Sequence, residues 1–444
     1  MKKYIFALFV AAAALNTQQA SAQTDAYEMT VNGVKIIVQP AQNDIVEIQT
    51  IIKGGVQNYP ATKTGIESLA MSALTECGTE KHDKNAFKNA LDKVSAQVYG
   101  YAQKDYSVVR MNCLKGDFDT VWPLYVEALT QPKFDATEFT RIKSVAIARL
   151  QSANSQPDNA IDNFADSIAF GKQDYAKDPA GTVPTLSKLT AVETKAYYNS
   201  VFTKSHLLIV VVSSLDKATI EAKVKGLLGD VKQGQPFALK KSFFRVYKNS
   251  FNAEAKGLAT NYVEGVTSGP QPGTKDFDAF MVGMRIFANR HFVDIRTKNG
   301  LSYAPQAWFS AGATSTARFS VTTTDPNKYI TVFDKLVDSI KTKGFDAEEV
   351  ANMKITYLTG FYYKNETNSA QASSIASNEV LHGNWKRSLT MVDDIKKLTV
   401  AQVNTAFRNY IGNTIWVYQG DPKKVNPVFF INGTLKKGDN PVSH

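Results

Sequence analysis

The sequence predicts an α+β protein made of two homologous domains in tandem, each a mostly antiparallel sheet with helices packed on one face. Three observations predict this class. One pattern of residues occurs twice along the 444 residues, and a chain of this length exceeds one ordinary core. Strand-like runs also come in groups instead of alternating strictly with helices, which favours antiparallel pairing.

The repeat is clearest in two segments, Phe-Asp-Ala-Thr-Glu at 134–138 and Phe-Asp-Ala-Glu-Glu at 345–349, which lie 211 positions apart. A Leu-Thr pair at 189–190 likewise recurs at 398–399. In each five-residue segment the Asp is expected to cap a helix, with the Glu three positions later and a hydrophobic residue before the cap. A long helix is therefore expected in each half.

Strands with alternating faces are expected to open each half, and a buried strand is expected near its end. The expected strands are 34–38, 45–52, 106–113 and 207–212 in the first half, and 259–263, 317–323 and 415–418 in the second. Amphipathic helices are expected over 121–129 and 332–340. Gly, Gln, Pro and Lys interrupt the pattern at 229–244, so the domains are expected to span 23–235 and 236–444.

Residues 1–22 are typical of a signal peptide. Lys2 and Lys3 precede an apolar run from Ile5 to Leu15, and a small-residue cleavage site, Ala-Ser-Ala, follows at 20–22. A membrane-spanning helix needs about 20 apolar residues, which is longer than this run. No cysteine near the cleavage site could carry lipid, so the mature chain is expected to start at Gln23 and to be secreted into a periplasm or outside the cell.

The charge and the cysteines limit the function only weakly. The chain has 51 Lys and Arg against 41 Asp and Glu, and removal of Lys2 and Lys3 leaves a net charge of +8. The basic residues are scattered singly, which favours a solvated basic surface over a nucleic-acid site. Cys77 and Cys113 could form one disulfide or could be two buried apolar side chains, and the sequence leaves both interpretations open.

A capping box is expected at 64–67, Thr-Gly-Ile-Glu, and the helix after it ends at Gly-Thr, 78–79. A helix in this position, after a strand and a Gly-containing loop, resembles one in the pitrilysin/insulinase family of inverted-zincin metallopeptidases. In that family the helix carries His-x-x-Glu-His. The two histidines bind zinc from one helix face while the Glu activates water.

The residues of this chain depart from the metal motif at every position. Ser68 and Ser72 occupy the histidine positions, and Met71 occupies the glutamate position. The resemblance also implies a third ligand, a Glu on the long helix after the Phe-Asp cap, but 144–149 has no acidic residue and Arg149 would repel a metal. We therefore expect no catalytic residue, no metal and no cofactor in this chain.

Other catalytic machinery is also absent from the sequence. The five histidines include no pair at helical metal-binding spacing, and no GxSxG elbow occurs. Neither cysteine lies in a recognisable protease signature. An independently active hydrolase would thus need a site that the sequence does not supply.

The second half contains Arg-Thr-Lys-Asn-Gly-Leu-Ser-Tyr at 296–303, which resembles the family's second-domain motif of Arg, four residues, Leu, then Tyr. The resemblance implies that Arg296 and Tyr303 bind the substrate's backbone and its reacting carbonyl. Guanidinium and phenol groups both donate hydrogen bonds to carbonyl oxygens. A purely structural interpretation also fits part of the motif, because Gly300 could end the helix in a left-handed cap that Leu301 covers.

The resemblance covers nearly the whole mature chain. Bacterial members of this length are similar to the halves of mitochondrial processing peptidase, in which one chain keeps the zinc motif and its partner keeps the Arg/Tyr pair. The resemblance implies a non-catalytic, substrate-binding subunit of a heterodimeric zinc peptidase that acts on unfolded peptides, with zinc in the partner. The alternative is a peptide-binding or assembly protein with this fold and no proteolytic role. Peptide substrate, cleavage preference and homodimer formation stay open.

Overall fold

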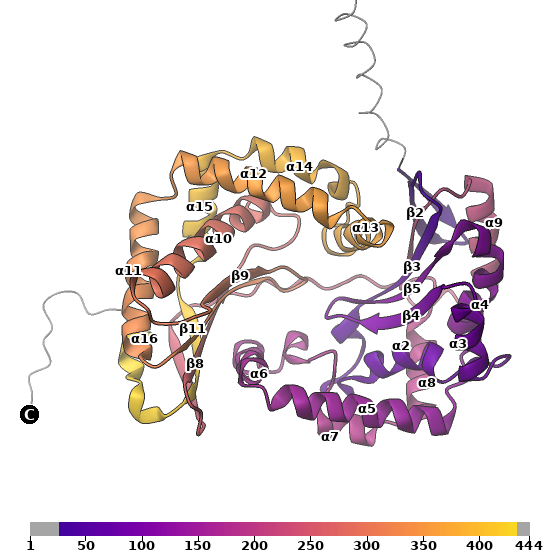
Figure 1. Cartoon of the computed structure of the whole chain (residues 1–444), viewed down its shortest axis with the longest axis horizontal. Coiled ribbons are helices and arrows are strands. Elements are labelled where there is room, and N and C mark those ends of the chain that lie inside the picture. The colour runs from indigo at the N-terminus through magenta and orange to yellow at the C-terminus, as the bar shows by residue number, and fades with distance from the viewer. Residues whose placement is uncertain (1–25, 433–444) are drawn as a thin grey trace, which may run out of the picture.

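The computed structural model describes residues 26–432, which form two similar halves with one sheet each (Figure 1). The expected signal peptide lies outside the described residues. The strands are β1 (Tyr27–Val31), β2 (Val34–Pro40), β3 (Ile45–Lys53), β4 (Gln97–Ala102), β5 (Tyr106–Leu114), β6 (Leu207–Ser213), β7 (Ser250–Ala255), β8 (Asn261–Ser268), β9 (Gln306–Ser310), β10 (Thr316–Thr323) and β11 (Thr414–Gly420).

The helices occur in the same order relative to the strands in both halves, except that the first half has one more helix between β3 and β4. In the first half they are α2 (Ile66–Glu76), α3 (Lys84–Asp92), α4 (Phe118–Thr130), α5 (Ala136–Asn154), α6 (Pro157–Phe170), α7 (Val183–Lys188), α8 (Ala191–Val201) and α9 (Lys217–Leu227). In the second they are α10 (Phe277–Phe292), α11 (Pro326–Lys343), α12 (Ala347–Lys364), α13 (Asn368–His382), α14 (Arg387–Lys397), α15 (Val400–Tyr410) and α16 (Pro427–Asn432).

The two sheets have the same topology. Their strand orders are β1-β2-β6-β3-β5-β4 and β7-β11-β8-β10-β9, which coincide once β1 is removed. Each sheet has one parallel pair, β2 with β6 and β7 with β11, and its other pairs are antiparallel. The predicted α+β class with two homologous, mostly antiparallel domains is therefore confirmed. The halves are joined between α9 and β7 by a segment without regular structure, which contains the expected boundary at 235.

The predicted caps of α5 and α12 are confirmed, whereas the capping box predicted before α2 is not present. Asp135 accepts hydrogen bonds from the backbone of α5, and Asp346 forms a capping box with Glu349 at α12, as predicted. The capping box expected at 64–67 is wrong. Gly65, with φ of 93°, precedes α2 and packs against Gly181, and no side chain caps the helix. Glu67 is buried instead of reaching back to the helix start.

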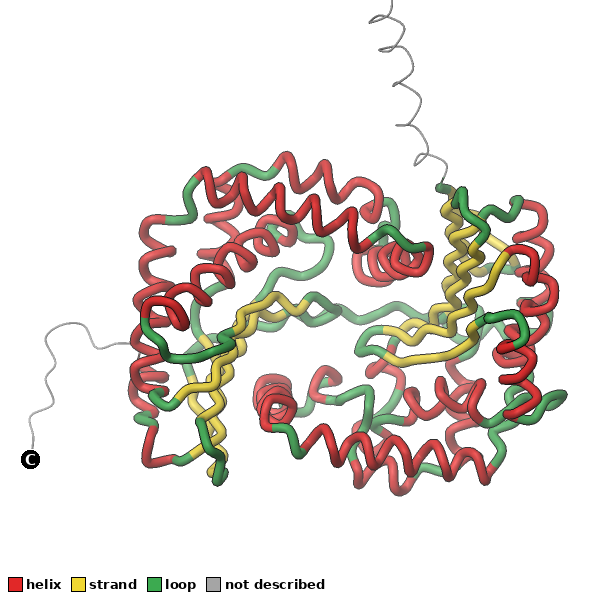
Figure 2. The backbone as a smooth tube through the Cα atoms, viewed as in Figure 1, coloured by secondary structure: helices red, strands yellow, loops and turns green. Residues whose placement is uncertain are grey.

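Each sheet is covered on its outer face by helices of its own half and on its inner face by a helix of the other half. Helix α13 packs on β3 and β6, and α6 packs on β8 and β11 (Figures 1 and 2). The α13 contact is apolar, with Ile375 and Ala376 in one buried cluster with Ile51 and Val210. The helices predicted on one face are thus present, and the exchanged helices interlock the halves on the other.

A buried ion pair occurs at equivalent places in the two sheets. Arg110 Nε lies 2.7 Å from Glu47 Oε1 across β3 and β5, and Arg318 Nη1 lies 2.9 Å from Glu264 Oε1 across β8 and β10. In both sheets the Arg stands opposite the residue two positions after the Glu. The duplication therefore extends to single polar side chains on the inner faces.

Neither of the two cysteines forms a disulfide. Cys77 and Cys113 are both free thiols in the interior, and burial raises the pKa of each to about 12. They behave as small apolar side chains.

Within residues 26–432, every helix is too short or too polar to cross a bilayer.

Candidate functional site

Two of the three residues at the metal-motif positions line a pocket in the first half. Ser68 and Ser72 lie one turn apart on α2, and both are half-buried. They line a cavity of about 490 Å³ together with Arg149 of α5. The structure thus brings together two of the predicted motif positions and the arginine that the sequence singled out.

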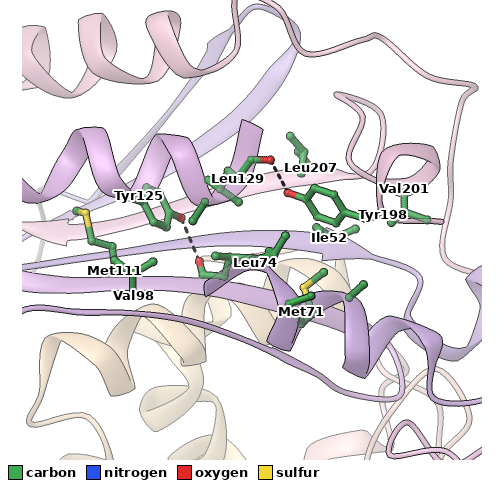
Figure 3. Close-up of a cluster of buried hydrophobic side chains, with 14 of the residues drawn as sticks. Ile52, Met71, Leu74, Val98, Met111, Tyr125, Leu129, Tyr198, Val201 and Leu207 are labelled. Carbon is green, nitrogen blue, oxygen red and sulfur yellow. Dashed lines mark hydrogen bonds between the residues drawn. The ribbon is translucent and has the colours of Figure 1, made fainter. Parts of the chain in front are cut away.

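Met71 has a different environment. It is fully buried and belongs to the core cluster that also contains Ile52, Leu74 and Tyr198 (Figure 3). Tyr198 donates a hydrogen bond of 2.7 Å from its hydroxyl to the Leu129 carbonyl, which fixes its ring in the same cluster. A thioether in this core can pack, but it cannot activate water.

The pocket does not fit a zinc ion. Zinc sites in proteins use His, Cys, Asp or Glu, and the three central residues supply two hydroxyls and a guanidinium. Glu76, the acidic residue in the lining, is bound by Arg141 at 2.7 Å and Lys88 at 2.5 Å. No three His, Cys, Asp or Glu side chains placed to hold a metal occur in the part of the chain that the structure describes.

An unpaired sheet edge borders the pocket. Strand β4 pairs with β5 and with no other described strand, so its outer edge is free. Gly100 of β4 lies so close to α2 that an added Cβ would come within 2.7 Å of the Met71 carbonyl oxygen. Tyr99, next to it, also lines the pocket and receives a hydrogen bond of 2.8 Å from Arg110 Nη1. The pocket therefore opens beside a strand that can accept another strand.

Sequence reasoning missed one buried acid on α2. Glu67 is 1% exposed and accepts hydrogen bonds from the hydroxyls of Ser107 and, at 2.5 Å, Tyr197. Burial raises the pKa of Glu67 to about 7, although both hydrogen bonds act in the opposite direction. The signal in the sequence is an acid beside apolar positions, and the same pattern also fits the capping box that the sequence predicts.

The Arg/Tyr segment of the second half forms the cap that the structural interpretation predicts. A π-helical segment, Val293–Lys298, extends α10, and Gly300 follows with φ of 60°. The Leu301 backbone donates to the Ile295 carbonyl at 2.9 Å, and Leu301 is buried. Tyr303 lies in the loop before β9 and not at the start of a strand.

The same segment also brings Arg296 and Tyr303 into direct contact. Arg296 Nη1 donates to the Tyr303 carbonyl at 2.9 Å, and the guanidinium carbon lies 4.1 Å from the centroid of the Tyr303 ring. Tyr303 is 78% exposed. The two residues do not line the first-half pocket, so the structure places the Arg/Tyr pair and the altered metal positions at separate sites.

The histidines have structural environments. His82 Nδ1 lies 2.8 Å from Glu127 Oε2, and His206 stacks on the Phe237 ring. Burial lowers the pKa of His291 to about 3 and contributes most to lowering that of His382 to about 4. None of these four histidines lines the pocket between α2 and α5.

Comparison with known families shows which family the chain belongs to, which the geometry of the pocket alone does not. The family model described as insulinase (peptidase family M16) matches residues 35–183, and the model described as peptidase M16 inactive domain matches residues 188–357. Together the two models cover most of the described chain. The chain belongs to the insulinase family, peptidase family M16. It represents a branch of M16 that lacks the zinc motif.

Two curated relatives are similar to this chain at low identity. An uncharacterized zinc protease of Bacillus subtilis, YmxG, is 18% identical over 383 residues, which cover 84% of this chain and 92% of the relative. Cytochrome b-c1 complex subunit 2 of Yarrowia lipolytica is 23% identical over 207 residues, 46% of this chain and 47% of the relative.

Solved structures share the fold. A peptidase M16 inactive domain from Pseudomonas fluorescens superposes with a TM-score of 0.81 at 16% identity, covering 91% of this chain and 99% of the other. The periplasmic protease PqqL from Escherichia coli gives a TM-score of 0.77 at 15% identity, covering 90% of this chain and 47% of the other. These similarities establish the architecture of both halves.

Proposed function

We propose that this M16 chain is the non-catalytic, substrate-binding subunit of a heterodimeric zinc peptidase that acts on unfolded peptides. The observation that carries the proposal is the stacked pair of half-buried Arg296 and exposed Tyr303 in a chain whose first-half pocket does not fit a zinc ion. The partner would be a pitrilysin-like subunit that bears the zinc motif.

Arg296 and Tyr303 have hydrogen-bond donors that could bind a peptide. Of the five N–H donors of a guanidinium, Arg296 uses one in its bond to the Tyr303 carbonyl. The Tyr303 hydroxyl has no hydrogen-bond partner among residues 26–432. Stacking restricts the guanidinium plane, so its free donors are oriented before a peptide carbonyl arrives.

In the proposed complex, zinc belongs to the partner and would polarise the scissile carbonyl there. This chain's Arg296 and Tyr303 would orient the peptide backbone and stabilise negative charge that develops on the carbonyl oxygen. Their separation from the pocket of Ser68 and Ser72 supports action on a second chain.

We further propose that the protein is secreted and resides in the periplasm. The signal-peptide pattern of residues 1–22 supports this location. The fold neighbour described as a periplasmic protease, PqqL, is compatible with it.

The test is reconstitution. Zinc content and cleavage of an unfolded peptide are measured for the purified chain, for a zinc-motif M16 relative from the same organism, and for their mixture. We expect a stable complex, zinc bound by the relative, and cleavage that needs both chains. Full activity of the relative alone, or zinc-dependent cleavage by this chain alone, would contradict the proposal.

A second candidate is a peptide-binding or assembly protein without proteolytic function. The similarity to cytochrome b-c1 complex subunit 2 of Yarrowia lipolytica favours it, because that relative is described as a component of a complex and not as a protease. Failure of any zinc-motif relative to bind this chain, combined with peptide binding by the chain itself, would favour this candidate.

A further inference from the structure

The first-half pocket has one charge without a partner. Three charged residues line it, and two of them, Glu76 and Arg141, pair with each other at 2.7 Å. Arg141 also binds Glu138 at 2.6 Å. Arg149 has no ion pair or hydrogen bond within the described residues, and its side chain is exposed. The pocket therefore has a net charge near +1.

Unused hydroxyls lie around the same cavity. Ser68 and Ser72 line it from α2, and neither hydroxyl has a hydrogen-bond partner in the described part of the chain. Both can donate to an anion. The remaining wall is largely apolar, with Leu69, Ile142 and Leu150 among its residues. One cation, two donors and apolar walls suit a small organic anion.

The free edge of β4 indicates which kind of molecule contains the anionic group that the pocket binds. Gly100 and Tyr99 of β4 are part of the lining, so a peptide added to the strand edge would pass the pocket mouth. Extended peptides bind exposed sheet edges through main-chain hydrogen bonds, and adjacent pockets select their side chains. The cavity of about 490 Å³ lies in the size range of ligand pockets.

We propose that the pocket between α2, β4 and α5 binds a carboxylate of an extended peptide, held by Arg149 and the hydroxyls of Ser68 and Ser72. A carboxylate matches the single unpaired positive charge, whereas a phosphate dianion would leave excess negative charge next to Glu76. The position used for metal in the resembling peptidases would thus be an anion site in this chain. The peptide's role as substrate rests on the proposed function, but its binding does not require the partner.

The test uses the full mature chain alone and three fluorescein-labelled ten-residue peptides of Ser, Thr and Val. One has a central Glu and an amidated C-terminus, one has Gln in its place, and one has Gln with a free C-terminal carboxylate. Fluorescence anisotropy is expected to show at least about tenfold tighter binding of one carboxylate peptide than of the neutral peptide. The tighter of the two identifies the carboxylate as side chain or C-terminus.

Variants assign the preference to the pocket. Arg149→Gln is expected to reduce the preference to less than about twofold, and Ser68→Ala with Ser72→Ala to weaken carboxylate binding by about fivefold. Arg245→Gln removes the same charge from an exposed position outside the pocket and should leave the preference intact. Equal binding of all three peptides, or a preference that survives Arg149→Gln, would overturn the proposal.

Two further readouts separate this proposal from others. Displacement of the peptide by inorganic phosphate but not by acetate would overturn the carboxylate assignment. Arg149→Gln should remove the carboxylate preference of the isolated chain while it leaves assembly with the zinc-motif relative unchanged. The pocket and the proposed function can therefore fail independently.

Discussion

The guanidinium of Arg296 stacks on the ring of Tyr303 and donates a hydrogen bond to the backbone oxygen of the same residue. A second ring, that of Phe292, lies 5.1 Å from the same guanidinium. The contact joins the end of the π-helical segment to the loop before β9. It restrains a half-buried cation that would otherwise sample more rotamers, which is the arrangement expected of a binding residue.

Arg296→Ala should lower kcat/KM of the reconstituted complex at least tenfold, about 1.4 kcal/mol, because a donor to the reacting peptide is lost. Stability should change by less than about 0.5 kcal/mol, since the pair lies at the surface. Peptidase kinetics and urea unfolding measure the two effects. Unchanged turnover in a complex that still assembles would refute the role of Arg296.

Tyr303→Phe separates stacking from hydrogen bonding. The phenylalanine ring can still stack on Arg296, so any loss of activity reports on the hydroxyl. We expect kcat to fall by about tenfold with little change in KM, because a donor to developing negative charge acts mainly in the transition state. A rise in KM with unchanged kcat would instead indicate ground-state binding by the hydroxyl.

Glu67→Gln should change the pH dependence of stability. The folded pKa of Glu67, about 7, lies above the ordinary value of 4.5, so the native state binds the proton more tightly than the unfolded state does. Stability from this group is therefore fully present below pH 4.5 and is lost as the pH rises to about 7, by an amount on the order of 3 kcal/mol.

The Gln side chain mimics the protonated acid and does not titrate. The difference in free energy of unfolding between Glu67→Gln and wild type should thus become more positive between pH 5 and pH 8. Glu76→Gln, at a half-buried position on the same helix, serves as the control, because its carboxylate has a lowered pKa. Parallel pH profiles for wild type and Glu67→Gln would disprove this prediction.

A triple variant, Ser68→His, Ser72→His and Arg149→Glu, should bind about one zinc ion per chain. The three positions line one pocket, and two histidines four residues apart on a helix face suit zinc. Metal analysis after dialysis measures the stoichiometry, and the same variant with Ala at position 72 is the control. A folded triple variant without zinc would mean that the three side chains do not converge.

The duplicated buried ion pairs should differ in their contribution to stability. Arg318→Met leaves fully buried Glu264 without its cation and should cost about 3–5 kcal/mol. Arg110→Met should cost less, about 1–3 kcal/mol, since Glu47 keeps hydrogen bonds of 2.9 Å from Gln49 and Asn112. Urea unfolding measures both, and a larger loss at Arg110 would contradict the comparison.

Much of the fold was predictable because its signals are local. The caps at Asp135 and Asp346 confirm the helix starts, and alternating apolar residues identify strands such as β5 and β10. The wrong capping box at 64–67 has a tertiary cause. Gly65 packs against Gly181, far away in sequence, and this contact decides the backbone conformation before α2.

The candidate sites were predictable only as residue types. The Arg/Tyr motif could be located from its spacing, but its stacking depends on the left-handed turn at Gly300, which brings Tyr303 back over Arg296. The pocket could not be foreseen as an anion site, because the pairing of Arg141 with Glu76 and the isolation of Arg149 are properties of the packed helices.

The sequence by itself determined the two-fold repeat, the α+β class, and the absence of a His-x-x-Glu-His pattern, because each depends on residue types and spacing along the chain. Only the tertiary structure decided that α6 and α13 exchange between halves, that Glu67 is buried with a raised pKa, and that Arg149 stands unpaired in the altered pocket. These properties depend on contacts between segments far apart in sequence, where burial and pairing of charges replace local propensity as the deciding forces.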